Sequence, residues 1–180
     1  MKDFDIININ TLSEDVIGQT VAAMSPARRT RIDAHPAARR RESAAAEYLA
    51  GELIFRRTGR RDPVIVQDER GRPFFRGCSL FLSLSHSGDY AAAAVSDRPV
   101  GIDIERLRPV SPGILRLFAT ENEQALFGGT EENILRLWTL KEAYFKATGL
   151  PFAAWKKTDL SELWECTFRR ENVVGTVIEK

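Results

Sequence analysis

Apolar residues in the first sixty positions predict one strand followed by three helices. Residues 4–9 mix apolar and polar side chains in a way typical of a half-buried strand. Residues 13–14 (Ser-Glu) and 25–26 (Ser-Pro) each have the form of a helix start, because serine caps free N–H groups and proline suits the first turn. From 40 to 57, apolar residues recur at helical spacing among frequent alanines, which predicts one long helix that ends at 58–59 (Thr-Gly).

The middle of the chain consists of short apolar runs separated by turn residues. Residues 64–66 are predicted as a strand and 70–73 (Arg-Gly-Arg-Pro) as a turn. Residues 80–84 alternate apolar side chains with serine, which predicts a strand that ends at the sequence Ser-His-Ser-Gly. Residues 90–95 and 100–104 are predicted as two further strands.

The last third combines helices with a closing hairpin. Residues 114–118 and 123–127 are predicted as short helices, and 131–148 as a longer helix. Residues 164–168 and 173–178 are predicted to pair as a hairpin. Because strands and helices occur in both halves without strict βαβ alternation, the pattern predicts an α+β fold and not a doubly wound sheet.

Composition restricts the class of protein. The chain has 180 residues, 43% of them hydrophobic and 28% charged, which fits one globular domain or two small halves sharing a core and excludes disordered and collagen-like classes. The net charge of +1 hides an asymmetry, because arginines crowd residues 28–61 and acidic residues populate the second half. This distribution suggests an anionic ligand on one half and a cation on the other. A near-neutral chain whose arginines are not accompanied by an interleaved aromatic platform argues against nucleic-acid binding.

The sequence favours a cytoplasmic protein. Its start has early acidic residues and no unbroken apolar run, unlike a signal peptide, and no stretch of 18 apolar residues would span a membrane. Cys78 and Cys166 lie far apart without CxxC spacing, so a zinc site or a disulfide framework is not expected and both thiols are predicted to be reduced.

The first candidate for chemistry is the sequence Gly-Ile-Asp-Ile-Glu at 101–105. Residues two apart on a strand point to the same face, so Asp103 and Glu105 project together while the isoleucines face the core. Paired carboxylates suit a hard cation such as Mg²⁺. An acidic pair on a strand is also typical of a solvated face, so this motif by itself leaves both interpretations open.

Two further motifs carry titratable side chains. In Trp-Thr-Leu-Lys-Glu-Ala-Tyr-Phe-Lys at 138–146, Glu142 and Lys146 lie one helical turn apart, which by itself is typical of a surface ion pair. In Ser-Leu-Ser-His-Ser-Gly at 83–88, His86 follows a strand and precedes a glycine turn, where an imidazole can face a phosphate. A nucleophilic Ser–His pair is disfavoured because sequence neighbours rarely adopt triad geometry, and a structural histidine is the alternative.

The three motifs together, in this order, resemble the surfactin-type family of 4'-phosphopantetheinyl transferases. The resemblance covers residues 70–151 and extends loosely to the earlier Ser-Pro-Ala-Arg-Arg-Thr-Arg. It implies an α+β chain of two similar halves packed as a pseudo-dimer, with the active site in the cleft between them. Residues 1–100 would form the N-terminal half and 101–180 the C-terminal half, which is shortened at its end. A monomer is expected, since one chain already holds both halves.

The resemblance also implies a reaction. Phosphopantetheine would move from coenzyme A to a serine of an apo acyl or peptidyl carrier protein, with release of 3',5'-ADP. Asp103, Glu105 and Glu142 would hold Mg²⁺ against the pyrophosphate. Glu142, or a water that it holds, would accept the serine proton, and Lys146 would stabilise or protonate the leaving phosphate. The residues implied to bind coenzyme A are Arg28, Arg31, Arg41, Arg72, Ser85, His86 and Lys141, with the arginine register around 39–41 open by one position.

Some features depart from the family or remain open. Residues 153–180 are compressed to little more than one hairpin, and the acidic residue expected after Phe118 has two candidates, Glu121 and Glu123. A non-catalytic module that binds coenzyme A or a nucleotide is the alternative function. Such a module would need the arginines and His86 but not the three acidic residues with Lys146. The biosynthetic pathway of the carrier, whether for fatty acids, polyketides or nonribosomal peptides, is also open.

Overall fold

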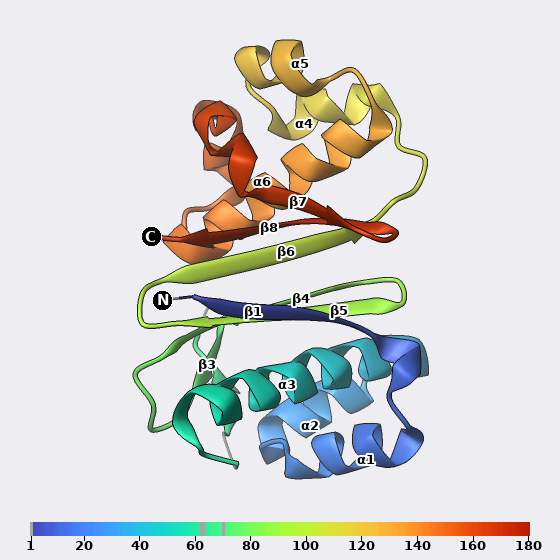
Figure 1. Ribbon diagram of the computed structural model, residues 1–180, viewed down its shortest axis with the longest axis vertical. Coiled ribbons are helices and arrows are strands. Elements are labelled where there is room, and N and C mark those ends of the chain that lie inside the picture. Colours follow the sequence, from blue (N-terminus) through green and yellow to red (C-terminus); the bar gives the residue numbers. More distant parts are fainter. Residues whose placement is uncertain (1, 62–63, 70) are drawn as a thin grey trace.

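Two three-stranded antiparallel sheets face each other in the middle of the molecule (Figure 1). The structure is a computed structural model that describes residues 2–61, 64–69 and 71–180. The first sheet has the order β1-β5-β4 and consists of Asp3–Asn8 (β1), Phe81–Ser87 (β4) and Tyr90–Ser96 (β5). The second has the order β6-β8-β7 and consists of Val100–Arg106 (β6), Thr167–Arg170 (β7) and Val173–Glu179 (β8). A separate ribbon pairs Ile65–Gln67 (β2) with Pro73–Phe75 (β3).

Helices lie on the outer side of each sheet, which gives a mixed helix-and-sheet fold (Figure 1). The first sheet is covered by Glu14–Ala23 (α1), Pro26–Asp33 (α2) and Ala37–Thr58 (α3). Beyond the second sheet lie Leu115–Phe118 (α4), Glu121–Phe127 (α5) and Glu131–Thr148 (α6). Short 3₁₀ turns occur at Ile9–Thr11 (η1), Pro112–Ile114 (η2), Phe152–Lys157 (η3) and Ser161–Cys166 (η4). Within the described residues, no helix combines the length and the apolar character needed to cross a bilayer.

The predicted helix boundaries that depend on local chemistry are confirmed. Ser13 accepts a hydrogen bond from the backbone N–H of the third residue of α1, and Ser25 does the same for α2. Gly59 and Gly149 adopt left-handed conformations at the ends of α3 and α6, which glycine permits without strain.

Four predicted boundaries differ from the structure. Helix α3 begins at Ala37 and α5 at Glu121, each a few residues before the predicted start. Strand β4 continues to Ser87, so the Ser-His-Ser sequence belongs to the strand and not to the turn after it. Most of 164–168 is wrong as a strand, since η4 occupies these residues up to Cys166 and β7 begins only at Thr167. The predicted turn 70–73 begins at Arg70, which lies outside the described residues.

Strand β5 is buried on both faces, and its sequence suits this position. Because side chains alternate along a strand, Ala91 and Ala93 pack against the helical side of the sheet, while Ala92 and Ala94 pack against the second sheet. Alanine is small enough to let helix α3 and the second sheet approach from opposite sides. The first sheet is therefore held closely against β6.

A close contact between β6 and α6 depends on one glycine. A Cβ atom added at Gly101 would lie 1.8 Å from the carbonyl oxygen of Ala143, so any larger residue would force the helix and the strand apart. Ala143 directly follows Glu142, and Gly101 lies two residues before Asp103 on the same strand. This approach therefore brings the acidic residues of the strand and of the helix into the same region.

Candidate active site

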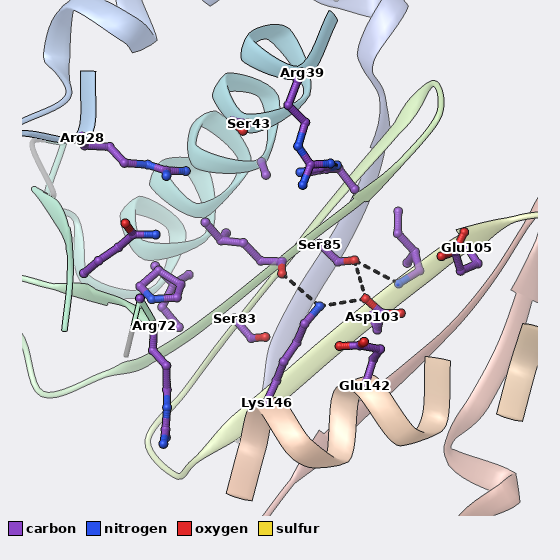
Figure 2. A pocket seen from close by; sticks show the side chains of 18 of the residues that line it. Arg28, Arg39, Ser43, Arg72, Ser83, Ser85, Asp103, Glu105, Glu142 and Lys146 are labelled. Carbon is purple, nitrogen blue, oxygen red and sulfur yellow. Dashed lines mark hydrogen bonds and ion pairs between the residues drawn. The ribbon is translucent and has the colours of Figure 1, made fainter. Parts of the chain in front are cut away.

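A cavity of about 520 Å³ lies between the N-terminal helices, β4, β6 and α6 (Figure 2). Eight of the residues named from the sequence line it: Arg28, Arg72, Ser85, His86, Asp103, Glu105, Glu142 and Lys146. The three sequence motifs therefore open onto one cavity. Arg31, Arg41 and Lys141 are not among its lining residues.

One wall of the cavity is acidic and carries a single lysine. Lys146 Nζ lies 2.7 Å from Asp103 Oδ1 (Figure 2). It also donates to the backbone carbonyl of Ile102 at 3.1 Å. The partner of Lys146 is therefore an aspartate of strand β6, and not Glu142 one turn away on its own helix. The interpretation of Glu142 and Lys146 as a surface pair is wrong, because both side chains line the cavity.

Negative charge is concentrated on this wall. Burial raises the pKa of Glu142 above its ordinary value, and the nearby charges of Asp103 and Glu105 raise it further against the opposing effect of Lys146. Burial likewise raises the pKa of Glu105, which a hydrogen bond from Ser87 partly offsets. A raised carboxyl pKa means that the site disfavours further negative charge and would gain from a bound cation.

The carboxylates retain oxygens that could act as ligands. The hydrogen bonds and the ion pair of Asp103 fall on Oδ1, and the hydrogen bond of Glu105 falls on Oε2. Of the residues the structure describes, none donates a hydrogen bond to Asp103 Oδ2, to Glu105 Oε1 or to either oxygen of Glu142. In their present arrangement, no three acidic, histidine or cysteine side chains in the described chain are grouped closely enough to hold a metal ion.

His86 borders the acidic wall and is tied to helix α3. Arg39 Nη1 lies 3.0 Å from His86 Nδ1, and Glu42 Oε2 lies 3.1 Å from the same atom. Burial first, and then the positive charges of Arg39 and Lys146, lower the pKa of His86 to about 4. The imidazole is therefore neutral near pH 7. Nδ1 thus lies within reach of both a guanidinium donor and a carboxylate acceptor, whereas Nε2 contacts neither of these two residues.

The opposite wall carries arginines from two helices. Arg28 on α2 lines the cavity, and its Nε donates to Glu47 Oε1 at 2.5 Å. Burial raises the pKa of Glu47, although the hydrogen bond and the charge of Arg28 oppose this shift. Arg39 on α3 completes the basic wall. Arg72, just before β3, also lines the cavity, but its side chain points away from Arg28 and Arg39 and its guanidinium lies beside Gly149 at the end of α6.

Of the three arginines at 39–41, Arg39 is the one that lines the cavity. Arg39, Ser43 and Ala46 line the cavity and recur at i, i+4 and i+7, which is one face of α3. Arg41 points elsewhere: it donates to the carbonyl of Leu12 at 2.6 Å, pairs with Glu14 and does not line the cavity. The helical spacing of Arg39 with the small residues after it was the sequence signal that could have identified it.

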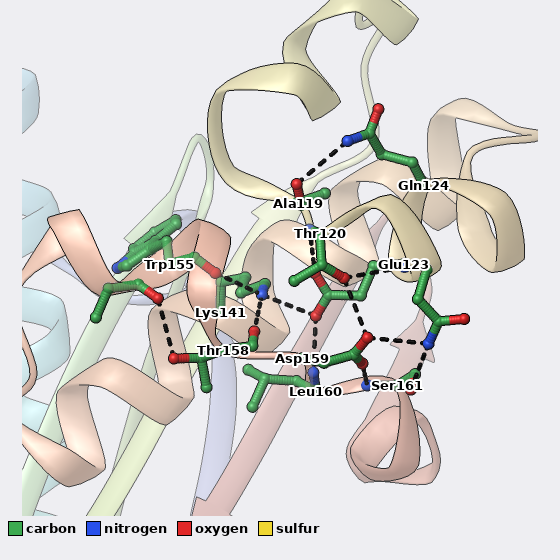
Figure 3. Close-up of polar contacts among 12 residues, drawn as sticks. Ala119, Thr120, Glu123, Gln124, Lys141, Trp155, Thr158, Asp159, Leu160 and Ser161 are labelled. Atoms are coloured by element: carbon green, nitrogen blue, oxygen red, sulfur yellow. Dashed lines mark hydrogen bonds and ion pairs between the residues drawn. The ribbon is translucent and has the colours of Figure 1, made fainter.

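Arg31 and Lys141, which the resemblance placed at coenzyme A, do not line the cavity either. Arg31 donates to the side chain of Gln67, which itself lines the cavity, but Arg31 does not. Lys141 is fully buried on the other side of α6, where Nζ lies 2.8 Å from Glu123 Oε1 and donates to the carbonyls of Trp155 and Thr158 (Figure 3). A lysine enclosed in this way has no access to a ligand in the cavity.

Glu123 is part of the same buried network. It completes a capping box with Thr120 at the start of α5 and accepts from the backbone N–H of Leu160 at 2.8 Å. Of the two acidic residues considered after Phe118, Glu123 is buried and Glu121 is exposed, and neither lines the cavity. Glu123 and Lys141 therefore tie α5, α6 and residues 155–160 together.

The part of the chain that forms the acidic wall is similar to a known protein family. Residues 99–175 match the family model described as the 4'-phosphopantetheinyl transferase superfamily. The matched region contains both the Gly-Ile-Asp-Ile-Glu motif and the motif with Glu142 and Lys146.

Several curated 4'-phosphopantetheinyl transferases are similar to the chain. The transferase psf-1 of Bacillus pumilus is 37% identical over 118 residues, which cover 58% of this chain and 51% of the relative. The transferase gsp of Aneurinibacillus migulanus is 33% identical over 117 residues, covering 58% of this chain and 49% of the relative. The chain thus spans about half the length of these curated relatives.

A solved structure is also similar to part of the chain. A holo-(acyl-carrier-protein) synthase from Bacillus anthracis, in complex with CoA (3',5'-ADP), matches 52% of this chain and 91% of its own with a TM-score of 0.43 and 24% identity.

Proposed function

We propose that the protein is a magnesium-dependent 4'-phosphopantetheinyl transferase, which moves the phosphopantetheine arm of coenzyme A onto a serine of an apo carrier protein and releases 3',5'-ADP. One observation carries the proposal: Asp103, Glu105, Glu142 and Lys146 line a single cavity that also holds His86 and has arginines on its opposite wall. A diphosphate substrate needs cations on both sides, and a serine nucleophile needs a base. The cavity supplies groups suited to both tasks.

The donor set of the acidic wall fits a magnesium ion. Magnesium prefers a few carboxylate oxygens together with substrate phosphates, and Asp103, Glu105 and Glu142 each keep an oxygen without a hydrogen bond from the described residues. The ion would neutralise charge on the phosphates during transfer. Raised pKa values of Glu105 and Glu142 support a need for such a cation.

The chain's own residues account for the proton and the leaving group. The hydroxyl oxygen of the carrier serine forms a bond to the β-phosphorus of coenzyme A, and Glu142 accepts the proton that this hydroxyl loses. The bond from that phosphorus to the bridging oxygen breaks, and 3',5'-ADP leaves. Lys146, which borders the same wall, stabilises the negative charge that develops on the leaving phosphate.

The basic wall is suited to the 3'-phosphate of coenzyme A. The guanidinium groups of Arg28 and Arg39, with the imidazole of His86 beside Arg39, offer several donors to one phosphate group. Arg72, which lines the cavity but points away from these two arginines, would approach the adenine or its phosphate.

The 3'-phosphate assignment predicts discrimination between coenzyme A and 3'-dephospho-coenzyme A. The wild type should bind the dephospho form about 10–100-fold more weakly, because hydrogen bonds to charged groups contribute about 1.5–3 kcal/mol. Isothermal titration calorimetry measures both affinities. Arg28→Ala should reduce the discrimination, whereas Arg40→Ala, at an exposed residue outside the cavity, should keep it. Equal binding of the two ligands by the wild type would contradict the assignment.

We further propose that residues 1–100 and 101–180 are two similar halves of a pseudo-dimer and that the cavity is the cleft between them. The two sheets support this view, because in each the first strand pairs with the last strand, which in turn pairs with the middle one. Each sheet also carries one long helix, α3 or α6, on its outer side. The monomeric state and the cytoplasmic location stay predictions.

Transfer itself tests the function. The protein is incubated with coenzyme A, MgCl₂ and a panel of apo acyl and peptidyl carrier proteins, and each carrier is analysed by intact-mass spectrometry. One carrier should gain the mass of phosphopantetheine, and EDTA should prevent the gain. Tight binding of coenzyme A without transfer to any carrier would instead support the non-catalytic module.

A further inference from the structure

Three serines at alternate positions of β4 connect the two sheets. Ser83, Ser85 and Ser87 point to the same face of the strand because side chains alternate along it. Their Oγ atoms accept hydrogen bonds from backbone N–H groups of β6, from Ile102 at 3.0 Å, from Ile104 at 3.2 Å and from Arg106 at 3.0 Å. Strands β4 and β6 belong to different sheets, so these hydroxyls take the place of a backbone ladder between them.

Two of the three hydroxyls also hold a carboxylate. Ser85 Oγ donates its proton to Asp103 Oδ1 at 2.7 Å (Figure 2). Ser87 Oγ donates to Glu105 Oε2 at 2.7 Å. Ser85 and Ser87 thus each contact the backbone N–H of one β6 residue and the carboxylate of the β6 residue that precedes it in the sequence. Ser83 follows the same backbone pattern, but the corresponding residue is Gly101, which has no side chain.

The arrangement constrains how the carboxylates can bind a cation. A hydroxyl-to-carboxylate hydrogen bond is among the strong ones, and both Ser85 and Asp103 are buried, where such a bond is strengthened further. With one oxygen of each carboxylate held by a serine, the side chain cannot rotate freely, and the other oxygen remains available. Because its proton is given to Asp103, Ser85 has none left for a substrate phosphate.

We propose that Ser85 and Ser87 are positioning residues that aim Asp103 and Glu105 at a divalent cation in the cavity, whereas Ser83 only fastens β4 to β6. The inference rests on the proposed function, since that function supplies the cation. It also replaces the sequence-based assignment of Ser85 as a residue that touches coenzyme A.

Binding of Mn²⁺ separates a positioning role from a merely structural one. Calorimetric titration of Mn²⁺ in the presence of 3',5'-ADP is carried out on the wild type and on Ser83→Ala, Ser85→Ala and Ser87→Ala, together with urea unfolding without metal. All three substitutions should lower stability, because each removes an acceptor for a backbone N–H of β6. Only Ser85→Ala and Ser87→Ala should also weaken Mn²⁺ binding, by about 10–100-fold, as expected for groups that orient metal ligands.

A conservative variant and the possible outcomes complete the test. Ser87→Thr keeps a hydroxyl at this half-buried position and should bind Mn²⁺ more tightly than Ser87→Ala does. If Ser85→Ala does not fold, the comparison of Ser87→Ala with Ser83→Ala still tests the proposal. Wild-type affinity for Mn²⁺ in Ser87→Ala, or a loss no larger than that of Ser83→Ala, overturns the positioning role alone. Absence of Mn²⁺ binding by the wild type overturns this inference and the metal dependence of the proposed function together.

Discussion

Glu142→Gln should lower the rate of phosphopantetheine transfer by at least about 10²–10⁴-fold, the usual contribution of a general base. The amide cannot accept a proton at neutral pH and is a weaker ligand for a hard cation. Stability should not fall, because the pKa of Glu142 is raised by burial and by its acidic neighbours, and a neutral side chain removes this repulsion. Single-turnover transfer assays and urea unfolding measure the two effects.

Glu131→Gln provides the matched control for this substitution. Glu131 lies on the same helix but is exposed in its first turn, away from the cavity. Its replacement should leave the transfer rate within a factor of two or so, as expected for a surface substitution. Turnover of Glu142→Gln equal to that of Glu131→Gln would remove Glu142 from the mechanism.

Lys141→Met should destabilise the protein by about 3–5 kcal/mol, the usual effect of removing one partner from a buried ion pair. Both side chains of the pair Lys141–Glu123 are fully buried, and the lysine also satisfies the carbonyls of Trp155 and Thr158. Burial lowers the pKa of Lys141, and the hydrogen bond and the charge of Glu123 oppose this shift. Urea unfolding gives the change in the free energy of unfolding.

Two further variants test whether this loss of stability comes from the broken ion pair. Lys156→Met changes an exposed lysine of η3 and should cost little. The double variant Glu123→Gln/Lys141→Met should be more stable than the sum of the single losses predicts, because no charge is left unpaired. If Lys141→Met unfolds like Lys156→Met but binds 3',5'-ADP weakly, Lys141 acts on the ligand, as its position in the motif first suggested.

Adjacent residues of one motif thus have different tasks. Lys141 and Glu142 are neighbours on α6, and successive residues of a helix are rotated by about 100°. The lysine faces α5 and the 3₁₀ turns behind the helix, while the glutamate faces the cavity. A motif read as one functional unit therefore combines a residue of the fold with a residue proposed for the reaction.

The sequence by itself determined the features that depend on near neighbours. The serine caps of α1 and α2 and the glycines that end α3 and α6 are recognised from a few adjacent residues, since capping involves only the nearest backbone groups. The two-residue period of a strand likewise predicted that Asp103 and Glu105 share a face, and both line the cavity.

Only the tertiary structure decided which long side chains reach the cavity. Arg39 and Arg41 are two residues apart with the same chemistry, yet one meets His86 of β4 and the other the carbonyl of Leu12. Lys146 pairs with Asp103, and Ser85 and Ser87 bind β6, through contacts between residues distant in the chain. Local periodicity fixes the face of an element on which a residue lies, but the packing of elements far apart in sequence determines what that face meets.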